Sequence, residues 1–122
     1  MATFYLTQAS SPSAANVAAW QSQGFDFSVH PYVDCGYQCG VNATVNFVQS
    51  AYGITPRTNR THQVRWTGWT DAASILASRG LQMDFNSYQW GTWLANSGGP
   101  ALGYLNGGGL PMRFVDANGN VL

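Results

Sequence analysis

The stretch GFDFSVH, Gly24–His30, decides the fold prediction. Its apolar and polar residues alternate, which is typical of a β-strand, and Pro31 ends it. Residues 14–23 before it favour a helix, because a serine-rich turn precedes them and Gly24 follows them. A β-branched and aromatic stretch at residues 3–7 indicates an earlier strand. Strand, helix and strand in this order predict a parallel crossover unit.

The same alternation continues along the chain. Helical spacing predicts helices over residues 39–52 and 71–79, and strands are expected at 61–64 and 81–85. Two further strands, 101–105 and 112–115, follow with little helix between them. We therefore predict one α/β domain over residues 1–122, a partial (β/α) barrel with about five or six mostly parallel strands and three helices.

Charged residues make up 8% of the chain, all of them arginine or aspartate, and the formal net charge is zero. Without a basic stripe, we expect no nucleic-acid partner. No run of 18 apolar residues occurs, so we expect no membrane partner either. The low charge favours an apolar surface that meets another protein.

Two histidines, the only ones in the chain, fall at predicted strand ends. Functional groups gather at the carboxyl ends of parallel strands, so His30 and His62 are candidate metal ligands, with Asp34 as their companion. Imidazole and carboxylate ligands suit zinc or a similar divalent ion, and such a site activates water for hydrolysis. The alternative is that each histidine is an ordinary hydrogen-bonded residue.

Other residues leave alternatives open. Cys35 and Cys39 allow a local disulfide, two free thiols or two metal ligands. The arginines near His62 suit either an anionic substrate or a solvated loop; they are Arg57, Arg60 and Arg65. Three aromatic residues suit either stacking on sugar rings or packing in a core or interface; they are Tyr88, Trp90 and Trp93.

The chain resembles the polysaccharide-deacetylase (NodB homology) family. Ala2–Leu6 resembles the family's second-strand signature, and Gly24–His30 resembles the strand that ends in a metal-binding histidine. Four later stretches are similar to a divergent branch of that family, namely Arg60–Trp66, Met83–Phe85, Gly103–Tyr104 and Leu110–Asp116.

The resemblance implies a role for several residues. His30 is implied as a metal ligand, and Asp34 stands where the family has a second histidine. Arg60 lies at the place of the third motif's arginine, and Asp84 resembles the fourth motif's aspartate, which orients catalytic groups. We accordingly predict Asp84, Arg60 and Asp34 as catalytic residues.

The family's first aspartate pair and last catalytic histidine have no counterpart between Met1 and Leu122. The chain is therefore expected to be a truncated barrel segment that covers its open edges as a homodimer or higher oligomer. The function hypothesis is a zinc-dependent hydrolase of an ester, amide or phosphoester bond in a small-molecule or carbohydrate substrate. The alternative is a non-catalytic barrel fragment that binds carbohydrate or forms an assembly.

Overall fold

The computed structural model describes residues 2–9, 12–68, 70–86 and 112–122, together with four short strand segments between residues 88 and 104. The first part of the chain alternates strands and helices as far as Asp84. Its elements are β1 (Thr3–Leu6), α1 (Ala14–Ser22), β2 (Asp26–Val29), α2 (Tyr37–Tyr52), β3 (Thr58–Asn59), the 3₁₀ helix η1 (His62–Val64), α3 (Asp71–Ser78) and β4 (Met83–Asp84).

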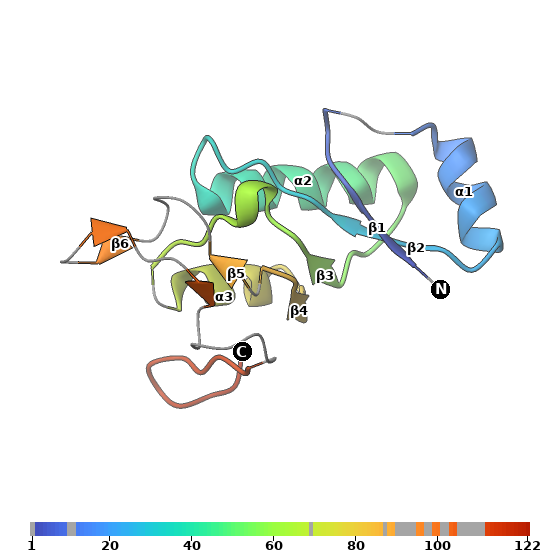
Figure 1. Ribbon diagram of the computed structural model, residues 1–122. Helices are drawn as coiled ribbons and strands as arrows, with labels where there is room; N and C mark the ends of the chain where they lie inside the picture. Colours follow the sequence, from blue (N-terminus) through green and yellow to red (C-terminus); the bar gives the residue numbers. More distant parts are fainter. Residues whose placement is uncertain are drawn as a thin grey trace.

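These four strands form one parallel sheet in the order β1-β2-β3-β4. Each strand pairs with the next one in the chain, and a helix lies in each connection. Helix α2 contacts α1 and α3, so the helices follow the order of the strands (Figure 1). The structure thus confirms the predicted α/β class with a parallel sheet and three helices.

The core lies between the sheet and these helices. Buried side chains of α2 recur at helical spacing, and Val41, Val45 and Val48 are fully buried. They pack with Phe27 and Val29 of β2, which alternate along that strand with more polar residues. This packing explains why the amphipathic pattern of residues 37–52 specifies a helix so well.

Local chemistry sets the helix ends. Ser13 caps α1, since its hydroxyl accepts a hydrogen bond of 3.2 Å from the Asn16 amide. Gly53 ends α2 in the left-handed region with a φ of 68°, which glycine adopts at little cost. Both ends match the sequence prediction.

The predicted strand count is wrong. The parallel sheet has four strands among the described residues, not five or six. The remaining strands form separate antiparallel pairs: β5 (Tyr88–Gln89) with β8 (Gly103–Tyr104), and β6 (Ala95–Asn96) with β7 (Gly99–Pro100).

Two predicted strand positions also need correction. The third strand lies at Thr58–Asn59, while the predicted stretch 61–64 holds η1. Residues 57–65 are polar and show no alternation of apolar and polar side chains. The pattern therefore predicts neither the position nor the pairing register of this strand. At 112–115 only Val115 pairs, through an isolated bridge to Val121.

Candidate functional site

The carboxyl ends of β2 and β3 bring the two histidines together. His30 directly follows β2, and its amide donates a 2.7 Å hydrogen bond to the Leu6 carbonyl. His62 lies three residues after β3, and its amide donates a 2.9 Å bond to the Pro31 carbonyl. The backbone therefore holds both residues at one edge of the sheet, 32 positions apart in sequence.

The two imidazole rings meet through one nitrogen each. His30 Nε2 and His62 Nδ1 are 3.3 Å apart, and the ring planes are nearly perpendicular at 89°. One neutral ring can donate an N–H to the other at this distance, or both lone pairs can point at a shared cation. The pair is half-buried, so either interaction is only partly screened by water.

Tyr32 completes an aromatic cluster with these rings. It lies face to face with His62, with ring centroids 3.9 Å apart and an interplanar angle of 18°. It also meets His30 edge to face, with centroids 5.9 Å apart. The stacked contact favours one orientation of the His62 ring. No sequence motif singled out Tyr32, although its place two residues after His30 was the available signal.

The environment favours the neutral form of His30. Burial lowers the pKa of His30, and the nearby His62 and Arg60 lower it further. A hydrogen bond to the backbone of Arg60 acts against these effects by raising the pKa of His30, but the net change remains a lowering. Neutral imidazole is the form that binds metal ions.

A second polar cluster lies around Asn59, which is completely buried. Asn59 Nδ2 donates to Asp84 Oδ1 at 2.6 Å and to Thr61 Oγ1 at 2.9 Å. The Thr61 hydroxyl also meets the hydroxyl of Tyr37 at 3.1 Å, and the Thr61 amide donates to Asn86 Oδ1 at 3.1 Å. Together these bonds fix the backbone immediately before His62. Asn59 and Thr61 were missed from the sequence because nothing nearby in the chain explains their burial.

Asp84 is a member of this second cluster. Its Oδ2 accepts a 3.1 Å bond from the Asn86 amide, so each carboxylate oxygen already has a donor. Burial raises the pKa of Asp84 to about 6, although hydrogen bonds from Asn59 and Asn86 oppose the shift. A buried carboxylate with both oxygens engaged is suited to positioning its neighbours more than to proton transfer.

The register separates the two clusters. Val29, Asn59 and Asp84 are cross-strand partners and therefore share one face of the sheet, the face toward α2. His30 follows Val29, so strand alternation directs its ring to the opposite face. The structure thus brings His30 and His62 together and places Asp84 beneath them, on the helix side.

Asp34 and Arg65 form an ion pair instead of joining the histidines. Arg65 Nη1 lies 3.0 Å from Asp34 Oδ1, and the Asp34 side chain is 72% exposed. Among the described residues, no group of three metal-ligating side chains forms. Asp34 is therefore not beside His30 and His62 in this structure. Cys35 and Cys39 form a disulfide, which decides between the three alternatives left open for them.

The remaining predicted residues lie apart or are not described. Arg60 follows β3 directly, is exposed, and is close enough to His30 to lower its pKa. Trp90 and Trp93 lie outside the described residues, and for Tyr88 the structure describes only the backbone pairing in β5. The proposed sugar-stacking residues therefore stay a prediction. In the described part of the chain, no helix is long and apolar enough to cross a bilayer.

Comparison of the chain with protein-family models, curated proteins and solved structures gave no significant match. The resemblance to polysaccharide deacetylases consequently rests on the quoted residues and stays a prediction.

Proposed function

We propose that this protein is a metal-dependent hydrolase whose divalent cation, zinc in the first instance, is held by His30 and His62. One observation carries the proposal: the 3.3 Å separation of His30 Nε2 and His62 Nδ1 at the carboxyl edge of a parallel sheet. Ligand sites occur preferentially at this edge.

The donor pair fits zinc. Two nitrogens bound to a tetrahedral zinc ion at about 2.0–2.1 Å lie roughly 3.3–3.4 Å from each other. The nitrogens of His30 and His62 have this spacing without any movement of the rings. The lowered pKa of His30 also leaves its ring neutral at pH 7, so that no proton competes for the lone pair.

The proposed roles divide between the two clusters. His30 and His62 bind the cation, and Tyr32 holds the His62 ring in place. The cluster of Asn59, Asp84 and Thr61 fixes the backbone that presents His62. Arg60, for which no ion pair occurs among the described residues, provides positive charge near His30 for a substrate oxygen that gains negative charge.

When bound, zinc supplies Lewis-acid chemistry, since it polarises carbonyl or phosphoryl oxygens and lowers the pKa of water. This chemistry serves esters, amides and phosphoesters, which is why the proposal names the class of bond and not one substrate. The charge of Arg60 favours substrates whose reacting group becomes an oxyanion.

The proposal is tested by titrating metal-free protein with zinc in a calorimeter and by assaying hydrolysis. Suitable substrates are p-nitrophenyl acetate, p-nitrophenyl phosphate and an acetylated chitooligosaccharide. We expect one zinc per chain, zinc-dependent turnover of at least one substrate, and loss of both in His30→Ala and His62→Ala. The matched control is Gln21→Ala on the exposed surface of α1, which leaves both properties unchanged.

Two results would contradict the proposal in different ways. Zinc binding that persists in both histidine variants would show that His30 and His62 do not form the zinc site. Zinc binding at His30 and His62 without turnover of any substrate would keep the metal site and reject the hydrolase, leaving a binding module.

A further inference from the structure

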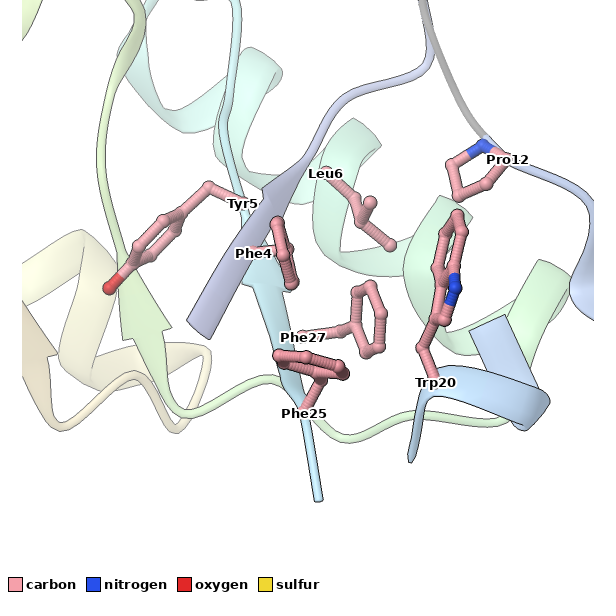
Figure 2. Close-up of a pocket in the computed structure, with 7 residues that line it drawn as sticks. All are labelled: Phe4, Tyr5, Leu6, Pro12, Trp20, Phe25 and Phe27. Atoms are coloured by element: carbon pink, nitrogen blue, oxygen red, sulfur yellow. The ribbon is translucent and has the colours of Figure 1, made fainter. Parts of the chain in front are cut away.

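An aromatic pocket lies between β1, β2 and α1. It has a volume of 740 Å³ and is lined by seven residues of the first 27, namely Phe4, Tyr5, Leu6, Pro12, Trp20, Phe25 and Phe27. Figure 2 shows six of these side chains gathered between β1, β2 and α1, while the Tyr5 ring points away from them. The pocket therefore belongs to the helix-facing side of the sheet.

Apolar surface stays exposed around this pocket. Phe4 stacks on Phe27 with centroids 5.7 Å apart and meets Phe25 edge to face at 5.5 Å, yet it is 49% exposed. Trp20 stacks on Phe27 at 6.2 Å and is 37% exposed. Along α1, rich in alanine, Val17 is the one buried residue. An exposed aromatic cluster of this kind marks a contact surface.

The edge of β1 next to the pocket is an open template for a strand. The carbonyls of Ala2 and Leu6 accept bonds from Asp26 and His30, so the even-numbered residues of β1 face β2. The backbone N–H and C=O groups of Thr3 and Tyr5 consequently face the other way. In the described part of the chain, no strand pairs with that edge.

The usual protections of an edge strand are missing. Residues 2–7 contain no charged residue and no proline, and β1 has no bulge opposite β2. A strand without charge can pair with its own copy without placing like charges opposite each other. The edge and the pocket together require an occupant that offers both a strand and apolar side chains.

We propose that a second copy of this chain is that occupant, and that the two β1 strands pair antiparallel across a two-fold axis at Phe4. In this register Thr3 of one copy faces Tyr5 of the other, and the outward N–H and C=O groups of both residues are satisfied. The two Phe4 residues then lie opposite each other, beside the pockets of both copies.

Side-chain sizes support this register. Across the proposed pairing, Leu6 faces Ala2 on the helix side and Tyr5 faces Thr3 on the other side, so a large residue always meets a small one. The single large pair is Phe4 with Phe4 at the axis, where each copy offers an open aromatic pocket. The dimer would join two four-stranded sheets into one of eight strands. This inference is independent of the proposed metal site.

The test combines sedimentation with cross-linking on the full chain. Cys35 and Cys39 form a disulfide, so an added cysteine is the one free thiol. Phe4→Cys, under mild oxidation, should give a disulfide-linked dimer on a non-reducing gel. The matched control is Met83→Cys on β4 at the opposite end of the sheet, 54% exposed in the wild type, which should stay monomeric on the gel.

A second pair of variants measures the interface without cross-linking. Phe4→Lys places two like charges on the axis and should raise the dimer dissociation constant at least about tenfold, whereas Met83→Lys should leave it unchanged. A wild-type chain that sediments as a monomer at 100 μM, a dimer indifferent to Phe4→Lys, or cross-linking through Met83→Cys in place of Phe4→Cys would each overturn the proposal.

Discussion

Tyr32 lies face to face on His62, with the two ring centroids 3.9 Å apart. If His62 binds a cation, this contact restricts the orientation of a ligand, as outer hydrogen-bond partners do, whose loss typically costs about 10–100-fold in metal affinity. We therefore expect Tyr32→Ala to weaken zinc binding about tenfold in a calorimetric titration. Tyr32→Phe keeps the stacked ring and should bind zinc as the wild type does. Equal loss in both variants would show that the hydroxyl, not the ring, matters.

Asp84 should make stability depend on pH in a definite window. Burial raises its pKa to about 6 from an ordinary value of 3.8, so the folded state binds a proton more tightly than the unfolded state. Its contribution to stability is therefore fully present below about pH 4 and is lost as the pH rises through 6. The expected size is about 3 kcal/mol, because the difference between pKa values of 3.8 and about 6 corresponds to about 1.4 kcal/mol for each unit.

The measurement is urea denaturation of wild type and Asp84→Asn between pH 4 and 7. We expect the free energy difference between the two proteins to change across this window and to level off above it. Other groups that titrate there, His30 included, contribute to both proteins and cancel in the difference. A difference that stays constant with pH would mean that Asp84 is not protonated in this range.

The sequence predicted the helices and the first two strands better than it predicted the site. Buried valines at helical spacing specify α2, and strand alternation correctly places His30 at the end of β2. The position of β3 was not predictable, because Asn59 is buried by partners far along the chain. Asp84 and Asn86, 25 residues away from the groups they bond, satisfy polar atoms that the local sequence would place in water.

The predicted companion of the histidines illustrates the same limit. Asp34 is four residues from His30 and was expected to share its metal ion. Arg65 binds that carboxylate instead. Because the two residues are 31 positions apart in sequence, no local sequence pattern predicts their ion pair. The spacing between His30 and Asp34 does not determine which residue Asp34 contacts. A turn of five residues can direct an exposed side chain toward the histidines or toward Arg65.

Gly40 should tolerate no side chain, although it lies inside a helix. A Cβ atom there would collide with the Tyr32 carbonyl oxygen and lie 2.8 Å from Val33 Cα, both of them backbone atoms. Replacement of a helical glycine by alanine ordinarily stabilises by up to about 1 kcal/mol. We expect the clash to reverse the sign, so that Gly40→Ala lowers the free energy of unfolding by about 2 kcal/mol.

Gly40→Ala also tests whether the packing of α2 affects the site. The backbone that the new Cβ atom would displace belongs to Tyr32 and Val33, and Tyr32 stacks on His62. Thermal unfolding gives the stability, and a zinc titration at a temperature where the protein stays folded gives the affinity. The control is Gln49→Ala on the exposed face of the same helix, which should change neither quantity. A Gly40→Ala protein as stable as the wild type would show that the loop yields easily.

The disulfide between Cys35 and Cys39 should stabilise the protein modestly. It closes a loop of five residues, for which the loss of chain entropy in the unfolded state corresponds to about 2 kcal/mol. Neither cysteine belongs to the buried core, so the fold should persist without the bond. We expect dithiothreitol to lower the free energy of unfolding of the wild type by this amount in urea titrations. The double variant Cys35→Ser/Cys39→Ser should unfold like the reduced wild type and should not respond to the reductant. If reduction instead unfolds the chain outright, the segment between β2 and α2 contributes far more to stability than its exposure suggests.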